Sequence, residues 1–244
     1  MDGSVCVVIP ALDEEDAIGA VVAGARANAD RVLVVDNGSV DATAERAAAA
    51  GACVVREPRR GYGSACMAGA RAAPEGSVLV FSDGDGSDDP GALGRLAGPV
   101  LADRADLVLG SRVLGRREPG ALRPHQLAAN RLFSWMIRTL WRAPVTDLGP
   151  MRAVRRERLL ALEIQSRTYG WPVEVVLKAA RSGLRVQEVP VDVRRRVAGR
   201  SKVSGSLRAS LRAGVCFVAA MARYGLGPLR LREAAPRRGR EEAA

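Results

Sequence analysis

The N-terminal half of the chain alternates regularly between strand patterns and helix patterns. Continuous apolar runs typical of buried strands occupy 4–9, 31–35, 52–55 and 77–82. Segments with apolar residues at helical spacing separate these runs, at 14–27, 41–50 and 62–73. The alternation predicts an α/β fold whose central sheet is mostly parallel and covered by helices. Ligands bind such sheets at the carboxyl ends of the strands, so the residues that follow each strand are candidates for a functional site.

The C-terminal half is less regular. Its pattern predicts strands at 105–110 and 184–193, a turn within 144–153, and helices at 124–141, 173–181 and 207–224. Neither a linker nor an internal repeat is apparent. We therefore expect one domain over 1–226, with a nucleotide-binding half at about 1–112 and an acceptor half at about 113–226. The Arg-, Glu- and Pro-rich segment 227–244 is expected to be a disordered basic tail.

The strongest local signal is an acidic loop directly after the fourth strand pattern. Four carboxylates crowd the seven positions from Asp83 to Asp89. Crowded carboxylates repel one another unless a cation or hydrogen-bond donors compensate them. Mg²⁺ and Mn²⁺ favour such hard oxygen ligands, usually one or two carboxylates together with substrate phosphates. We expect Asp83 and Asp85 to be functional, and Asp88 and Asp89 to cap the next helix.

Acidic residues also follow the first two strand patterns, in Pro10–Glu15 and Asp36–Ser39. The glycine fingerprint of a dinucleotide-binding fold is missing after the first strand. Acidic strand ends suit instead the base and ribose of a mononucleotide sugar. For Glu14 and Glu15 an alternative is that they complement the positive end of the following helix dipole.

The net charge of +10 rests almost wholly on arginine, since the chain has only two lysines. Arginine suits bidentate phosphate contacts, although a compositional bias of the genome is an alternative explanation. A nucleic-acid-binding protein is disfavoured, because there are only nine aromatic residues and the strand ends are acidic. No apolar run is long enough for a membrane span, and no signal peptide is apparent. The four cysteines lack metal-site spacing and are expected to be buried, which favours a cytoplasmic location.

Taken together, the motifs resemble family-2 glycosyltransferases of the GT-A fold, in particular the polyprenyl- and dolichyl-phosphate mannosyl- and glucosyltransferases. The resemblance covers about residues 4–210 and keeps the order of the motifs. Those motifs are VVIPALDEE, VVDNGSVDAT, RRGYGSACMAG, FSDGDGSDDP, LGSR, TDLGPMRA, YGWPVE, EVPV and GRSK. The resemblance implies an inverting enzyme that uses a nucleotide-sugar donor and Mg²⁺ or Mn²⁺.

The same resemblance implies roles for residues at the donor site. Asp36 would take the polar edge of the base, Asp83 the ribose side, and Asp85 the metal. Two departures, Asp13 in place of Asn and Leu12 in place of an aromatic residue, leave guanine and uracil both open as the base. The remaining residues implied to bind the donor are Pro10, Leu12 and Glu14 at the base, together with Arg60, Arg196, Ser201 and Lys202.

Further residues are implied for the acceptor and for the loop at 194–205. Arg112 and Arg152 would bind an acceptor phosphate, with a surface salt bridge as the alternative for Arg112. Arg196 and Lys202 belong to a basic loop that would fold over the diphosphate. The alternatives for this loop are an exposed basic segment or a contact with anionic lipid.

The class of acceptor depends on whether a general base is needed. A hydroxyl acceptor, on a natural product or a glycan, would require one, and Asp147 or Glu174 is the candidate. A phosphate acceptor is already anionic near neutral pH and needs only cations to position it. The arginine-rich middle of the chain favours a polyprenyl phosphate. The last helix, with Arg208, Arg212 and Arg223, is expected either to lie on an anionic membrane at the inner face or to pack into the core.

Overall fold

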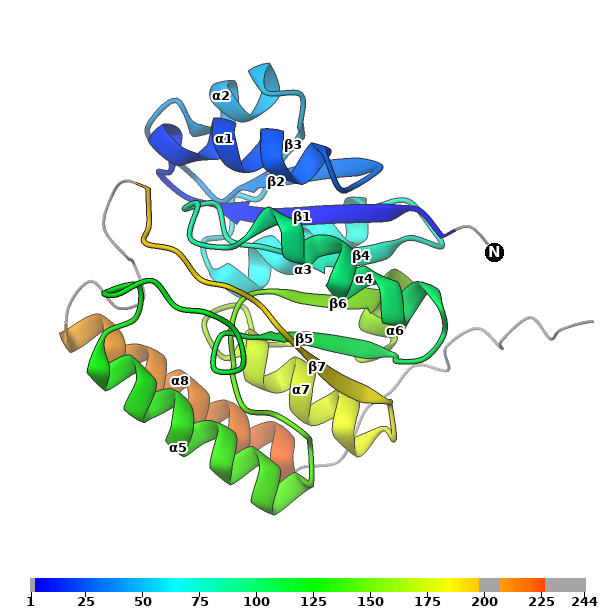
Figure 1. Cartoon of the computed structure of the whole chain (residues 1–244), viewed down its shortest axis with the longest axis vertical. Helices are drawn as coiled ribbons and strands as arrows, with labels where there is room; N and C mark the ends of the chain where they lie inside the picture. The colour runs from blue at the N-terminus through cyan, green and yellow to red at the C-terminus, as the bar shows by residue number, and fades with distance from the viewer. Residues whose placement is uncertain (1–2, 198–206, 227–244) are drawn as a thin grey trace, which may run out of the picture.

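A computed structural model of the chain describes residues 3–197 and 207–226, except for the side chains of 207–212. The described residues form one seven-stranded sheet in the order β3-β2-β1-β4-β6-β5-β7 (Figure 1). Every neighbouring pair is parallel except those that involve β6, which is antiparallel to both β4 and β5. The strands are β1 (Val5–Ala11), β2 (Arg31–Asp36), β3 (Cys53–Arg56), β4 (Val78–Phe81), β5 (Leu107–Ser111), β6 (Arg152–Arg155) and β7 (Val186–Pro190).

Helices cover both faces of the sheet. One face carries α1 (Glu15–Arg26), α2 (Thr43–Ala49) and α4 (Leu93–Leu101), the last preceded by the short helix η1 (Pro90–Ala92). The other face carries α3 (Tyr62–Ala72), α6 (Arg156–Ala161) and α7 (Trp171–Arg181). Outside α7 lie α5 (Pro124–Trp141) and α8 (Leu207–Leu226), along the lower edge of the molecule in Figure 1.

The two cores follow from the alternation of side chains along each strand. On β1, Val7 and Ile9 point into the core under α1 and α4, whereas Cys6 and Val8 point into the core under α3. Because both faces of the sheet are covered, its inner strands are apolar at nearly every position. This confirms the expected α/β fold with a mostly parallel sheet.

Three local details differ from the prediction. The strand β6, which follows the turn expected within 144–153, was not predicted, because its arginine ends hide the strand pattern. Asp89 alone caps the next helix, by accepting a hydrogen bond from the Gly91 amide, whereas Asp88 turns inward. Cys53 is exposed and Cys216 is only half-buried, although Cys6 and Cys66 are buried as expected.

Candidate active site

The carboxyl ends of β1 and β2 form one wall of the site. They end side by side, because Ala11 pairs with Asp36 across the sheet. Pro10 and Leu12 are half-buried here, and Asp13 has a positive φ of 48°. Asn and Asp tolerate this left-handed conformation best among residues with a side chain, so Asp13 suits this position.

Asp36 and Asn37 organise the adjoining turns. Asp36 accepts a hydrogen bond from the Ser39 amide at 2.9 Å. The Asn37 side chain holds the segment before α3, by donating to the carbonyls of Glu57 and Arg59 and by accepting from the Gly61 amide at 2.7 Å. Sequence reasoning did not single out Asn37, whose partners lie 20 or more residues away.

A pocket of about 310 Å³ opens beside Asp36. Its lining includes Asp36, Ser39, Asp41, Glu45, Arg56 and Glu57. Carboxylates accept hydrogen bonds, so this acidic lining suits the N–H groups on the polar edge of a nucleobase. Arg60 lies nearby and donates to the Gly38 carbonyl at 3.0 Å.

The acidic loop after β4 forms the floor of the site. Burial, together with the negative charges of Asp88 and Asp85, raises the pKa of Asp83 well above its usual range. Burial also raises the pKa of Asp88 to about 6. Asp88 accepts hydrogen bonds from the Ser82 hydroxyl and the Asp83 amide, and Tyr62 donates to Asp83 at 3.3 Å. The loop therefore carries more negative charge than its own donors compensate.

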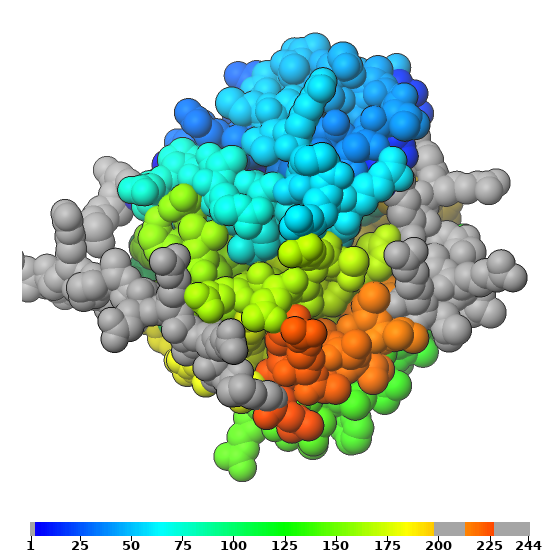
Figure 2. All heavy atoms as spheres, turned by 180° about the vertical axis from the view of Figure 1, so that it is seen from behind, coloured from blue at the N-terminus to red at the C-terminus, as the bar shows by residue number. Residues whose placement is uncertain are grey.

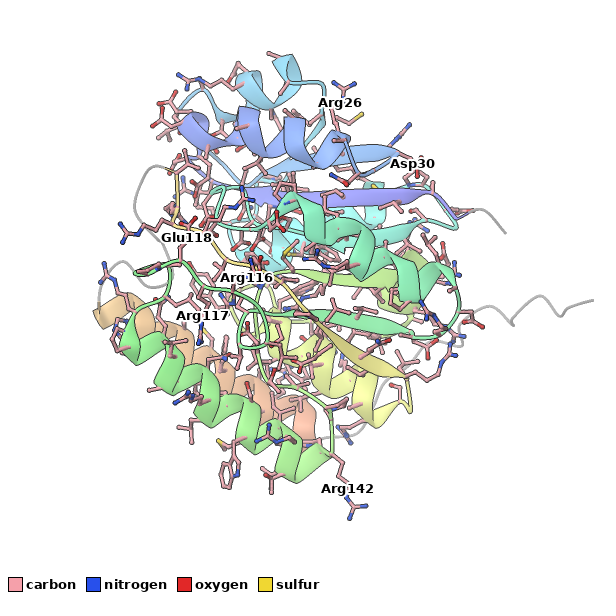
Figure 3. All side chains as sticks on the ribbon, in the orientation of Figure 1. Arg26, Asp30, Arg116, Arg117, Glu118 and Arg142 are labelled. Atoms are coloured by element: carbon pink, nitrogen blue, oxygen red, sulfur yellow. The ribbon has the colours of Figure 1, made fainter. Side chains whose placement is uncertain are left out.

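A strap of residues 191–197, which continues from β7, crosses this loop. Its backbone binds the loop directly, since the amides of Arg194 and Val197 donate to the carbonyls of Ser87 and Asp85. On its other side the strap pairs with the segment 116–118, whose side chains lie beside it in Figure 3. The strap thus joins the acidic loop to the segment that follows β5.

Arg196 on this strap bridges the acidic segment after β1 and the acidic loop after β4. Its guanidinium donates to both carboxylate oxygens of Glu14, at 3.0 and 3.1 Å, and lies 2.7 Å from Oδ2 of Asp85. Glu14 is buried at the N-cap position of α1 but caps no backbone amide. Arg196, Glu14 and Asp85, all named from the sequence, therefore meet at one point.

Arg112 and Asp147 form a bidentate ion pair at the end of β5. Nε and Nη2 of Arg112 donate to the two carboxylate oxygens at 2.7 and 2.8 Å, and the Arg112 amide donates at 2.8 Å. Asp147 is 2% exposed. Glu188 on β7 holds the segment that carries Asp147, by accepting from the amides of Thr146 and Asp147 and from the Thr146 hydroxyl. A salt bridge was the alternative expected for Arg112, but its partner Asp147, the burial of the pair and the role of Glu188 were not foreseen from the sequence.

Arg152 and Glu174 are buried away from solvent. Arg152 is 1% exposed, donates to the carbonyls of Gly149, Pro150 and Pro172, and lies over the Trp171 ring. Burial lowers the pKa of its guanidinium. An acceptor phosphate does not reach a side chain so enclosed, and this placement differs from the expected acceptor contact. Arg152 instead ties the start of β6 to the start of α7.

Glu174 is fully buried within α7. Its carboxylate pairs with Lys178 at 2.8 Å and accepts hydrogen bonds from the amides of Gln165 and Ser166. These partners hold the loop before α7, and none of them belongs to the acidic loop. The geometry favours a structural role for Glu174 over that of a base.

The residues around Asp85 fit a divalent cation whose coordination is completed by oxygens of a bound diphosphate. Among residues 3–197 and 207–226, no three His, Cys, Asp or Glu side chains are grouped to hold a metal by themselves. Mg²⁺ and Mn²⁺ commonly need only one or two carboxylates when a diphosphate supplies further oxygens. Oδ2 of Asp85 already faces a cation, the guanidinium of Arg196. Two other residues expected at the donor diphosphate, Ser201 and Lys202, lie outside the described residues.

An α/β sheet with acidic strand ends and an Asp-x-Asp loop defines the class, a nucleotide-sugar-dependent glycosyltransferase of the GT-A fold. The model of glycosyl transferase family 2 matches residues 6–161, and the chain belongs to that family. An uncharacterised glycosyltransferase of Mycobacterium tuberculosis is 47% identical over 210 residues, which cover 85% of this chain and 93% of the relative.

Two further comparisons bear on substrates. An undecaprenyl-phosphate mannosyltransferase of Micrococcus luteus is 35% identical, over 72% of this chain and 76% of its own. The crystal structure of glucosyl-3-phosphoglycerate synthase from Mycobacterium tuberculosis, with Mn²⁺, UDP and phosphoglyceric acid, superposes with a TM-score of 0.75 at 25% identity. That match covers 93% of this chain and 80% of the synthase. The same synthase also has a structure with Mg²⁺ and UDP.

Proposed function

We propose that this chain transfers a hexose, with inversion, from a nucleotide sugar of the GDP-mannose or UDP-glucose type to a polyprenyl phosphate. The proposed setting is the cytoplasm, at the inner face of an anionic membrane. Relatives named for undecaprenyl-phosphate and dolichyl-phosphate transfer support this acceptor class. Among the described residues, no helix is both long and apolar enough to cross a bilayer. We propose that the contact with the membrane is peripheral.

Residues at the strand ends carry the donor in this proposal. Pro10, Leu12 and Asp36 contact the base, and Asp83 the ribose. Glu14 and Arg196 hold the strap near the diphosphate, and Arg60, Ser201 and Lys202 complete the donor site. Mg²⁺ or Mn²⁺ held by Asp85 would neutralise the negative charge that develops on the leaving diphosphate.

One observation carries the choice of acceptor, the pairing of Asp147 with Arg112. A general base must lie within hydrogen-bond reach of the proton that it removes. Asp147 is almost fully buried and accepts three hydrogen bonds from Arg112, so both of its carboxylate oxygens already bind donors. Glu174, the other candidate base, forms an ion pair with Lys178. An acceptor that arrives without a proton to lose fits this arrangement.

The reaction then needs positioning more than proton transfer. A phosphate oxygen of the acceptor attacks the anomeric carbon from the face opposite the leaving diphosphate. The new carbon–oxygen bond forms as the bond to the diphosphate breaks, and no proton leaves the nucleophile because the second pKa of a phosphomonoester is about 6. Asp147 fixes the orientation of the Arg112 guanidinium, whose remaining N–H groups donate to that phosphate.

A substrate panel tests the proposal. Purified protein is incubated with GDP-mannose or UDP-glucose and Mn²⁺, alone, with polyprenyl phosphate, or with 3-phosphoglycerate, and release of the nucleoside diphosphate is measured. We expect release that depends on polyprenyl phosphate and stops in EDTA. Release that depends on 3-phosphoglycerate instead, or that persists in EDTA, would contradict the acceptor or the metal respectively.

A further inference from the structure

Helices α5 and α8 lie side by side and run in the same direction. The Phe133 and Phe217 rings are 5.3 Å apart, and Nε1 of Trp141 donates to the Gly225 carbonyl. The offset in sequence between Phe133 and Phe217 equals that between Trp141 and Gly225. The contacts therefore advance along both helices in the same direction, so the two helices are parallel. Their inner sides pack on each other and on α7, which leaves one outer side of each helix toward solvent.

These outer sides are unusually apolar. On α5 the side chains of Leu132 and Trp135 are each more than half exposed. On α8 between 213 and 226, the exposed positions are Val215, Val218, Ala219, Ala222, Arg223 and Leu226. Figure 2 shows α8, in orange to red, forming the lower surface of the molecule beside α5, in green. We call the exposed side chains of α5 and of α8 between 213 and 226 the α5/α8 face.

The charges of the α5/α8 face are all of one sign. Arg131, Arg138 and Arg142 lie along the exposed side of α5, and Arg142 projects from its end in Figure 3. Along the sequence, the segments 119–146 and 193–232, which include α5 and α8, contain 14 of the 37 Arg and Lys residues and none of the 27 Asp and Glu residues. The excess positive charge of the chain is therefore concentrated in these two segments rather than spread by a compositional bias.

The face adjoins the candidate active site. The helices α5 and α8 both begin on the side where β1 and β2 end, as Figure 1 shows. The segment that enters α5 starts at Arg112, and its residues 116–118 pair with the strap. A surface that the α5/α8 face rests on would thus lie next to the mouth of the site.

We propose that the α5/α8 face docks on an anionic lipid membrane, with Leu132 and Trp135 entering the interface and the arginines contacting headgroup phosphates. The proposal rests on the proposed function for its purpose, the delivery of a lipid acceptor. Exposed apolar side chains flanked by arginine, with tryptophan among them, are typical of helices that lie in the plane of a membrane. A second copy of this chain is a poorer occupant, because two such faces would bring arginines against arginines without a carboxylate between them.

Vesicle binding tests the docking without substrates. Vesicles of phosphatidylcholine alone, or mixed with phosphatidylglycerol, are sedimented with the full-length protein. We expect binding to the mixed vesicles only, weakened by added salt. Fluorescence of Trp135 should shift to shorter wavelength on binding, since Trp171 is fully buried and Trp141 is already hydrogen-bonded. L132S/W135S should reduce partitioning about tenfold or more, and R131Q/R138Q by a similar factor.

Matched substitutions away from the face serve as controls. Val40 is 88% exposed in the loop before α2, and Arg26 lies at the end of α1, far from Arg142 in Figure 3. V40S and R26Q should bind vesicles like the wild type. Equal binding by all variants, or none by the wild type, would overturn the docking. The docking would also be overturned if the wild type does not bind vesicles and sediments as a dimer that W135S dissociates. Because the vesicles hold no donor or acceptor, a failed transfer assay with intact binding would reject only the proposed acceptor.

Discussion

Asp147 and Glu174 are both buried carboxylates with a basic partner, yet the structure uses them differently. Asp147 holds Arg112, whose charge acts on Asp83 and Asp88 of the acidic loop, whereas Glu174 holds Lys178 and the loop before α7. A sequence motif shows only that a carboxylate is present. What it can do chemically depends on whether its oxygens are already taken by donors.

At the residue scale, Glu174→Gln should cost stability rather than catalysis. The change leaves Lys178 buried without its charge partner, which typically costs about 3 kcal/mol or more. For a domain of this size that corresponds to a fall in Tm of about 6–12 °C. We expect kcat/KM per folded molecule to stay within a few-fold of the wild type. A fully folded but inactive variant would restore Glu174 as a base.

Arg112 should determine acceptor binding. Arg112→Lys keeps the charge but loses the bidentate contact, and Arg112→Ala loses both. We expect the KM for the acceptor to rise about 10- to 150-fold in Arg112→Ala, the equivalent of about 1.5–3 kcal/mol for a charge-assisted contact. Arg112→Lys should fall between. Steady-state kinetics on folded protein would decide. If Asp147→Asn is inactive while Arg112→Ala is nearly normal, a hydroxyl acceptor becomes the better hypothesis.

Arg196 should compete with the metal for Asp85. Its guanidinium lies 2.7 Å from the carboxylate oxygen that we assign to the cation. Without nucleotide, Arg196→Ala should therefore bind Mn²⁺ about tenfold more tightly, as measured by titration of the free Mn²⁺ signal in electron paramagnetic resonance. Arg194→Ala is the matched control, because Arg194 pairs with Asp89 instead. Unchanged Mn²⁺ affinity in Arg196→Ala would contradict the competition.

At the scale of elements, the strap at 191–197 connects parts of the fold that the sheet alone does not. Its backbone binds the acidic loop on one side and the segment after β5 on the other. Gly115 lets that segment approach the Val191 backbone, where a Cβ would clash. We therefore expect a ligand bound at the acidic loop to alter the contacts of the strap.

Protection from trypsin should reveal this coupling. The strap carries Arg194, Arg195 and Arg196 in succession, and cleavage there requires it to leave the acidic loop. Donor nucleotide sugar together with Mn²⁺ should slow cleavage between Arg194 and Lys202, because the diphosphate brings counter-charges for these side chains. Fragments are followed by mass spectrometry, with the nucleotide or Mn²⁺ alone as controls. Equal cleavage in all conditions would argue against the coupling.

At the scale of the whole molecule, the acidic loop should make stability depend on pH. Burial raises the pKa of Asp88 to about 6, so without metal the folded protein keeps a proton that the unfolded chain releases near pH 4. The resulting stabilisation is complete below pH 4 and is lost as the pH rises to about 6. Asp88→Asn removes this loss, so its stability relative to the wild type should improve between pH 4 and 7, by up to about 3 kcal/mol. Denaturant titrations in EDTA measure it. A pH-independent difference would contradict the raised pKa.

Much of the fold and part of the site follow from local patterns. Apolar runs separated by helical spacing predict the parallel strands, and the residues after them, such as Asp36, Asp83 and Asp85, must then lie at one edge of the sheet. The antiparallel strand β6 escaped prediction, because its four residues begin and end in arginine. The enclosure of Arg152 by backbone carbonyls and Trp171 was not predicted either, because nothing in the local sequence distinguishes a buried arginine from an exposed one.

The sequence by itself determined the family, the α/β fold, and the acidic strand ends that suit a nucleotide sugar. Only the tertiary structure decided the partners of each charged group. Arg196 meets Glu14 across 182 positions of the chain, and Arg112 meets Asp147 across 35. Strand and helix patterns reflect neighbours a few residues apart, whereas a carboxylate's role depends on which cation the folded chain places beside it. That placement is set by how the strap and the loops pack, which no local pattern records.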